Sequence, residues 1–309
     1  MANKDALGIL VTREASTEAL YAKRVAMLTR RASEIFGEPA GLFDTIDAFA
    51  LCHEQFAAST IRQYSAALAW AIDRAEEECT LDDHQIAACR KQLTHTPVRR
   101  PRGAEPRTSA KKRRAVLPTE LHLVCEKLRL RGRADDKLLL RMLINNISFG
   151  LRPCEYQGAQ VTEIVLVVQS AKSTNGRGKR TRDYELAEMS RGQIESLKIL
   201  VRDLEDAANG NISGLIDRLG SRLRRACKSL GIVPFSLYST RHQAIANKKR
   251  SGSAAEVAAF AGHASIHTAR KYYAPRSAAW TIDKTAKPTL GTVERIVARM
   301  DRVNRPVIR

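Results

Sequence analysis

The stretch Ala261-Gly262-His263-Ala-Ser-Ile-His-Thr-Ala-Arg-Lys-Tyr272 decides how the rest of this chain is interpreted. It places a tyrosine nine residues after a Gly-His pair. Alone, a Gly-His pair is usually a capping turn, and the pair Tyr272-Tyr273 would usually pack in a core. The stretch becomes informative only in combination with three others.

Those three stretches lie upstream, each at a predicted boundary of secondary structure. The first ends a helix expected over 136–149, the second lies on a β-hairpin, and the third opens another helix. They are Phe149-Gly-Leu-Arg152-Pro-Cys-Glu155, Ser170-Ala-Lys172-Ser-Thr174 and Tyr238-Ser-Thr-Arg241-His242.

This set of side chains suits the cleavage of a phosphodiester without a metal. The reaction needs a nucleophile, fixed cations for the growing charge, and a proton for the leaving 5′-oxygen. Arg152 and Arg241 suit the second need, because a guanidinium is always charged and forks onto two oxygens. Lys172 could supply the proton. Tyr272 could attack, and its ester would store the bond energy without ATP.

The combination resembles the tyrosine recombinase (phage integrase) family. That family's pattern is Gly-Leu-Arg-x-x-Glu, a hairpin Lys, His-x-x-Arg-His, Leu-Gly-His and a Tyr nine residues later. The resemblance covers about residues 117–275. It implies that Arg152 and Arg241 clamp the scissile phosphate and that Lys172 is the general acid for the leaving 5′-oxygen. It also implies that His263 donates a hydrogen bond to a phosphate oxygen and that Tyr272 is the nucleophile. Glu155 would be a structural partner of the arginine motif.

The sequence departs from the family pattern in a few places. Tyr238 replaces the first histidine of His-x-x-Arg-His, and we count it among the catalytic residues. A phenol can donate a hydrogen bond to phosphate but is a poor base near neutral pH. Ala261 replaces a leucine, which is a small packing change. Other hairpin cations compete with Lys172 for the role of general acid, namely Lys179, Arg180 and Arg182.

The first 95 residues are predicted to be a helical domain. Helices are expected over 16–37, 44–57 and 59–78. On the first of them, the apolar residues fall roughly on one face, and they are Leu20, Val25, Leu28, Ala32 and Ile35. The domain is similar to the family's core-binding domain, with 59–64 as its most family-like segment.

A basic linker over 96–116 follows, rich in Pro and Gly. It carries eight cations, which are Arg99, Arg100, Arg102, Arg107, Lys111, Lys112, Arg113 and Arg114. It could be a solvated linker or a strap across a DNA backbone, and both can hold. We assign these residues to DNA binding.

The catalytic domain is expected over 117–285. A strand over 163–169, a turn at Asn175-Gly176 and a strand at 184–186 predict the hairpin. Helices follow over 190–208, 213–230, 253–261 and 267–274. The expected fold class is therefore mainly α with a small β-sheet (α+β).

A C-terminal tail over 286–309 carries a last apolar stripe of Val293, Ile296, Val297 and Met300. A short amphipathic helix must bury such a stripe somewhere. It could dock on its own domain or on a neighbouring protomer, and the family resemblance implies the neighbour.

Composition agrees with a nucleic-acid partner. Lys and Arg number 52 against 33 acidic residues, for a net charge of +19 and a pI near 10. No apolar run is long enough to cross a bilayer, so we expect no membrane partner. The six cysteines form no Cys-x-x-Cys pair and look like apolar fillers in a reducing cytosol. We expect a cytoplasmic, nucleoid-associated protein without metal or cofactor.

The resemblance implies a site-specific recombinase or integrase that rejoins DNA through a 3′-phosphotyrosyl intermediate, as mobile genetic elements use. Its partner would be duplex DNA with specific recombination sites. It would be a homo-tetramer on DNA, a monomer or dimer when free, and could need an accessory protein. One alternative is a catalytically inactive DNA-binding protein on the same fold, which Tyr238 favours. Another is a type IB topoisomerase.

Overall fold

The computed structural model describes residues 15–96, 113–171, 181–263, 265–268, 273–281 and 285–303, apart from the side chains of residue 16 and residues 299–303. The chain divides into two compact units, Met1–Lys111 and Lys112–Arg309. Each unit has its own buried apolar cluster.

Within residues 15–96, the first unit is helical. Its elements are α1 (Ala15–Phe36), α2 (Leu42–Cys52), the short 3-10 helix η1 (His53–Gln55), α3 (Ala58–Glu77) and α4 (Asp83–His95). Leu28 of α1 packs with apolar residues of the other helices, including Phe49, Leu68 and Ile86. The three helices expected from periodicity are present, but the second ends at Cys52 and continues as η1.

The fourth helix was not predicted, because few of its residues are apolar. Only Ile86 and Cys89 of α4 are buried. Its beginning does have a local signature: the Asp82 carboxylate accepts from the Gln85 amide at 2.7 Å, and the Gln85 side chain accepts from the Asp82 amide at 3.0 Å. This reciprocal cap marks a helix start that periodicity alone does not reveal.

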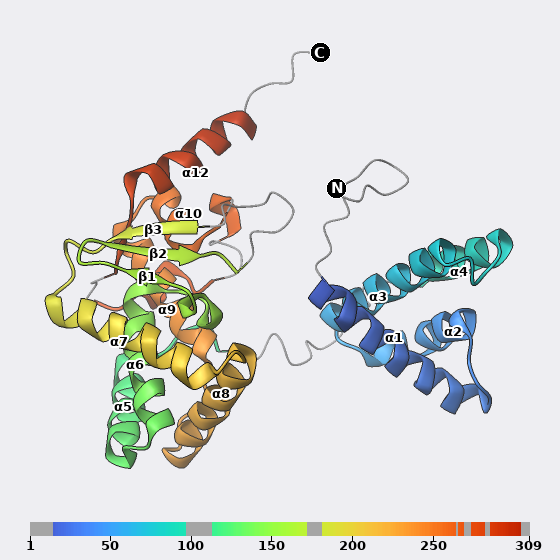
Figure 1. Ribbon diagram of the computed structural model, residues 1–309, viewed down its shortest axis with the longest axis horizontal. Helices are drawn as coiled ribbons and strands as arrows, with labels where there is room; N and C mark the ends of the chain where they lie inside the picture. Colours follow the sequence, from blue (N-terminus) through green and yellow to red (C-terminus); the bar gives the residue numbers. More distant parts are fainter. Residues whose placement is uncertain are drawn as a thin grey trace. The chain divides into compact units, whose positions relative to one another are not determined.

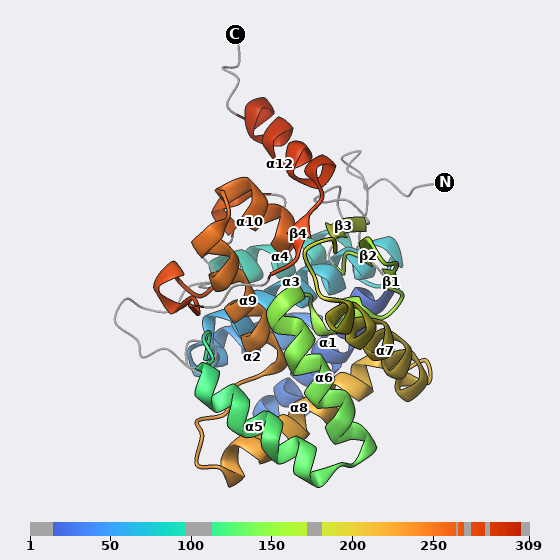
Figure 2. The same ribbon diagram turned by 90° about the vertical axis from the view of Figure 1, so that its left-hand side faces the viewer.

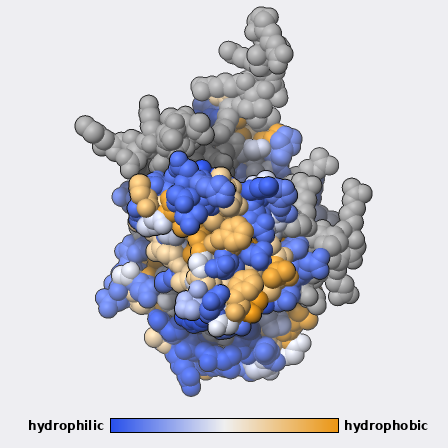
Figure 3. Space-filling model, turned by 90° about the vertical axis from the view of Figure 1, so that its right-hand side faces the viewer, coloured by the Kyte–Doolittle hydropathy of each residue, from blue (hydrophilic) through white to orange (hydrophobic). Residues whose placement is uncertain are grey.

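The apolar face predicted for α1 is buried only in its middle. Leu28 and Ala32 are buried, whereas Leu20 and Ile35 are exposed. A 22-residue helix is about 33 Å long, so its ends extend beyond the shorter α2. Figure 3, which faces this unit, shows hydrophobic residues exposed among hydrophilic ones, and the large exposed apolar residues are Leu20, Met27, Ile35, Phe36, Phe43 and Leu51.

The second unit is built around two helices that contact each other, α6 (Ala134–Phe149) and α9 (Leu237–Ser251) (Figures 1 and 2). Helices α5, α7 and α8 also contact α6, whereas α10 contacts α9. Their bounds are α5 (Pro118–Arg131), α7 (Arg191–Ala208), α8 (Ile212–Ser229) and α10 (Ala254–Ala261). The helix expected over 136–149 is present as α6, which leaves Ile144 49% exposed because its neighbours do not cover that side.

A small antiparallel sheet has the strand order β1-β2-β3-β4. Its strands are β1 (Gln160–Val161), β2 (Val165–Gln169), β3 (Thr181–Glu185) and β4 (Lys287–Pro288). In the central pair Leu166 lies opposite Tyr184, and both are buried. The predicted mainly α fold with a small β-sheet is therefore confirmed. The two-residue strands are too short for an alternation pattern, and the predicted turn at 175–176 lies outside the described residues.

The tail forms helix α12 (Leu290–Val303), which contacts α10 and extends away from the rest of its unit in both views (Figures 1 and 2). In the apolar stripe, Val293 and Ile296 are half-buried, but Val297 remains 43% exposed. The apolar stripe is thus covered only in part by its own unit. No described helix of either unit has the length and apolar character needed to span a membrane.

Candidate phosphate-binding site

The candidate site is organised by one buried carboxylate, Glu155. It accepts from Nη1 of Arg152 at 2.5 Å and from Nη2 of Arg182 at 2.7 Å. Nη1 of Arg241 lies 3.6 Å from the same carboxylate. Burial by itself would raise the pKa of Glu155, but the three arginines outweigh it and hold that pKa at about 2. The carboxylate is therefore ionised throughout the physiological range.

Arg152 reaches this carboxylate because the chain turns sharply after α6. Gly150 ends the helix with φ +58°, and a Cβ there would lie 2.7 Å from the Phe260 ring. A side chain at this position would thus be strained and would collide with α10. Arg152 follows in extended conformation as the N-cap of the 3-10 helix η3 (Pro153–Tyr156), and its own amide donates to Glu155 at 2.7 Å.

Arg241 lies in the second turn of α9 and is completely buried. Nη1 donates to the Gly150 carbonyl at 2.5 Å, and Nη2 donates to the Ala261 carbonyl at 2.6 Å. These contacts tie the ends of α6 and α10 to one guanidinium. Nε and Nη2 both point at the Tyr273 hydroxyl, each at 3.4 Å.

His263 follows α10 after a left-handed Gly262 and is buried. Burial, followed by the nearby Arg241, Arg152 and Arg182, lowers the pKa of His263 to about 3. The imidazole is therefore neutral at pH 7. Its Nδ1 has no hydrogen-bond partner in the structure.

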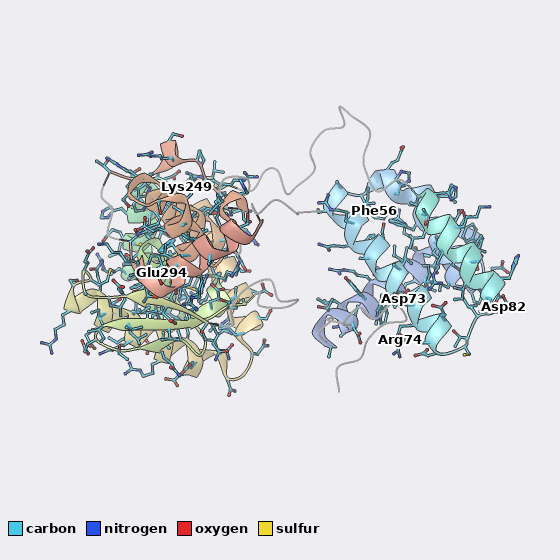
Figure 4. All side chains as sticks on the ribbon, turned by 90° about the horizontal axis from the view of Figure 1, so that it is seen from above. Phe56, Asp73, Arg74, Asp82, Lys249 and Glu294 are labelled. Carbon is cyan, nitrogen blue, oxygen red and sulfur yellow. The ribbon has the colours of Figure 1, made fainter. Side chains whose placement is uncertain are left out.

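Tyr273 lies between two histidine rings. Its ring centroid is 4.6 Å from that of His242 and 4.9 Å from that of His263. The segment after it is fastened to α9, since Lys249 of that helix, labelled in Figure 4, donates to the Ala274 carbonyl at 2.7 Å. Burial, then Arg114, Arg241 and Lys249, lowers the pKa of His242 to about 4.

Several residues predicted from the sequence fall within this cluster, and others cannot be placed. The structure brings Arg152, Arg241 and His263 together around Glu155. Tyr238 is 47% exposed, and partial burial raises its pKa, so the phenol stays protonated at neutral pH. The predicted residues outside the described part are Lys172, Tyr272, Arg99, Arg100, Arg102, Arg107, Lys111 and Lys112.

The two described linker cations differ from each other. Arg113 forms an ion pair with Glu120 and donates to the Val233 carbonyl at 3.0 Å. Arg114 is exposed, and its charge acts on His242. Arg113 therefore has contacts within its own unit, whereas Arg114 is placed beside the cluster.

The sequence motifs did not predict that Arg182 and Tyr273 belong to this cluster. Arg182 was considered only as a competitor for the general acid, and Tyr273 only as a residue that would pack in a core. The sequence did contain a signal for Arg182. It lies two residues before the buried Tyr184 in β3, and residues two apart in a strand have their side chains on the same face. Spacing from His263 selected Tyr272, and no local pattern indicated that the Tyr273 hydroxyl lies beside Arg241.

The chain is similar to a solved structure titled "Crystal structure of XerA recombinase", with 14% sequence identity and a TM-score of 0.36. The similarity covers 91% of this chain and 99% of that chain. No protein-family model and no curated protein matches the chain.

The charges of the cluster define what it can bind. Three guanidiniums surround one carboxylate, and the two histidines are neutral, which leaves an excess of two positive charges in a largely buried place. Uncompensated buried charge is costly, so the cluster is suited to an anion with several oxygens. In the described ranges, no group of three or more His, Cys, Asp or Glu side chains could hold a metal ion.

Proposed function

We propose that this protein is a site-specific DNA recombinase that cleaves and rejoins duplex DNA through a 3′-phosphotyrosine. The observation that carries the proposal is the excess of buried guanidinium charge around Arg152 and Arg241, adjacent to a neutral histidine. Such a group fits a single phosphodiester whose charge grows during the reaction. The order and spacing of the four sequence stretches support the same function.

In the proposed reaction a DNA phosphate takes the place of the Tyr273 hydroxyl at Arg241. The Nε–Nη2 edge of that guanidinium then binds one phosphate oxygen, while Arg152 binds another. His263, being neutral, donates one N–H, and the protonated Tyr238 phenol donates from the exposed side.

The covalent step is an in-line displacement. The Tyr272 phenol gives its proton to water as its oxygen bonds to phosphorus, and the bond to the 5′-oxygen breaks as that oxygen takes a proton from Lys172. The products are a 3′-phosphotyrosyl ester and a free 5′-hydroxyl. Attack by a 5′-hydroxyl of a second strand reverses the step and rejoins DNA.

The test begins with selection of bound duplexes from random sequence. A selected duplex with a nick beside the crossover should then trap the protein as a denaturation-resistant adduct. Sequence-specific binding without an adduct would favour the inactive DNA-binding protein instead. Relaxation of supercoiled plasmid that lacks a selected site would favour the topoisomerase.

We expect DNA binding to weaken steeply as the salt concentration rises, because the cations of the basic linker neutralise DNA phosphates. Replacing Arg99, Arg100, Arg102 and Arg107 by Gln should flatten the plot of log affinity against log salt by roughly 0.9 for each phosphate that the variant no longer neutralises. Filter binding over a salt series measures this slope. The control is the double replacement of Arg129 and Arg202, which already form ion pairs with Glu126 and Asp203. A linker variant with the wild-type slope would exclude phosphate binding by these arginines.

We also propose that α12 docks on a neighbouring protomer and builds a homo-tetramer on two duplexes. A chain ending at Gly291 keeps β4 and its pairing to β3, so it should still bind one site as a monomer but fail in synapsis and strand exchange. Val297→Asp, on the exposed side of α12, should weaken synapsis without removing the helix. Native gels with one and two sites measure both steps. Wild-type recombination by the shortened chain would show that α12 acts only within its own unit.

A further inference from the structure

Arg182 is the cation that the proposed mechanism leaves without a role. It lies in the middle region of β3, and its side chain is only 4% exposed. Nη2 donates to Glu155 at 2.7 Å. Nε and Nη1 are buried and have no hydrogen-bond partner in the structure. Two unsatisfied donors on a buried cation are costly, so a residue of this kind is expected to have a function.

The turn that carries His263 is shaped around this arginine. A Cβ on Gly262 would lie 1.9 Å from Nη1 of Arg182 and 2.7 Å from its Cδ. No side chain fits there, so the glycine allows β3 and the end of α10 to approach closely. The neighbouring Tyr184 adds a second link between them, because its hydroxyl donates to the Phe260 carbonyl at 2.7 Å.

Arg182 therefore contacts two parts of the cluster that come from distant segments of the chain. One is Glu155, which receives Arg152 on its other oxygen at 2.5 Å. The other is the backbone immediately before His263. Arg241 cannot replace Arg182 at the carboxylate, because Nη1 of Arg241 remains 3.6 Å away and is engaged by Gly150.

We propose that Arg182 is a positioning residue of this site, which holds the Glu155 carboxylate against Arg152 and supports the turn that carries His263. The inference rests on the proposed function for its effect on DNA cleavage, but the contacts it concerns exist without DNA. Among the charges that lower the pKa of Glu155, that of Arg182 has the largest effect, followed by Arg152 and Arg241. Removing the Arg182 charge should therefore raise that pKa.

The test compares Arg182→Met, which removes the charge, with Arg182→Lys, which keeps the charge but loses the fork. Adduct formation on the nicked duplex should slow about 10- to 100-fold in both, the size expected when a reacting group is misplaced. The Met variant should lose further activity as the pH is lowered, because its Glu155 carboxylate takes up a proton at a higher pH than in the wild type. The Lys variant should keep the wild-type pH profile. Lys287→Met, which removes a half-exposed cation from the adjacent strand β4, is the matched control and should stay within about twofold of wild type.

A second readout does not need DNA. The carbon-13 NMR signal of the Glu155 carboxyl, assigned with Glu155→Gln, should titrate at a higher pH in Arg182→Met than in the wild type. If the Met variant does not fold, Arg182→Gln serves as the neutral replacement. A Glu155 signal that titrates at the wild-type pH in the Met variant would overturn the proposal. A Met variant that has a lower cleavage rate and a lower melting temperature but keeps the wild-type pH profile would overturn it as well. Absence of an adduct in the wild type would instead count against the recombinase function, and the NMR titration would still decide the role of Arg182.

Discussion

Tyr272→Phe should bind its DNA site as the wild type does and form no covalent adduct. The phenol oxygen is the atom proposed to attack phosphorus, and its removal leaves Arg152, Arg241 and His263 in place. The nicked duplex that traps the wild-type protein provides the measurement, read as a band that survives denaturation. Binding of the intact duplex, measured in parallel, shows that the anion site is unchanged.

Tyr273→Phe is the matched control, because the structure places the Tyr273 hydroxyl 3.4 Å from two nitrogens of Arg241. On the helix predicted from the sequence over 267–274, adjacent side chains would point about 100° apart, so only one of the two tyrosines would face the phosphate. We expect this variant to retain the adduct, since the phosphate replaces that hydroxyl at Arg241. The reverse result, an adduct with Phe at 272 and none with Phe at 273, would identify Tyr273 as the nucleophile.

Arg152→Lys and Arg241→Lys should each reduce the cleavage rate by on the order of 100-fold, or roughly 3 kcal/mol of transition-state stabilisation. Lysine keeps the charge but has one nitrogen in place of a planar fork. Arg241 uses its three nitrogens at once, on Gly150, Ala261 and Tyr273. Single-turnover cleavage of the nicked duplex measures the effect, and specific binding should remain near that of the wild type.

Arg241→Lys should also lower the melting temperature more than Arg152→Lys, because it leaves two buried carbonyls without their donor. Arg141→Lys is the control for a charge-preserving change at a paired arginine, since Arg141 forms an ion pair with Asp203 in the same unit. Its cleavage rate should stay within about twofold of wild type. Rates within that range for Arg152→Lys and Arg241→Lys would mean that these arginines have a structural role only.

Local sequence patterns determined much of this fold. Period-3.6 apolar spacing predicted α1, α3 and α7, and the β-branched, apolar run over 163–169 predicted the hairpin strand β2. The glycine of Phe149-Gly-Leu-Arg152 marked the end of α6, where the structure has a left-handed Gly150. These features depend on the residue's own backbone and on neighbours within one turn, so they can be read without knowing the rest of the chain.

Part of the candidate site could be named from the sequence in the same way. Arg152, Glu155, Arg241 and His263 were selected by the order and spacing of short stretches, and the structure brings all four together. Spacing indicated the residue types that a phosphate site needs. It did not indicate which oxygen of Glu155 each cation contacts, or that Arg182 is one of them.

Only the tertiary structure decided those contacts. Arg152 is three residues from Glu155, but Arg182 is 27 residues away, and Arg241 approaches Glu155 from a separate helix, α9. Which cations contact a buried carboxylate depends on where separate elements pack. The free energy of such an ion pair depends on its burial, which arises only when distant segments pack together. The same holds for Ile144 and Leu20, apolar residues left exposed because no neighbouring element covers them. Periodicity reports the face that a segment offers, whereas packing of distant segments determines how much of that face is buried.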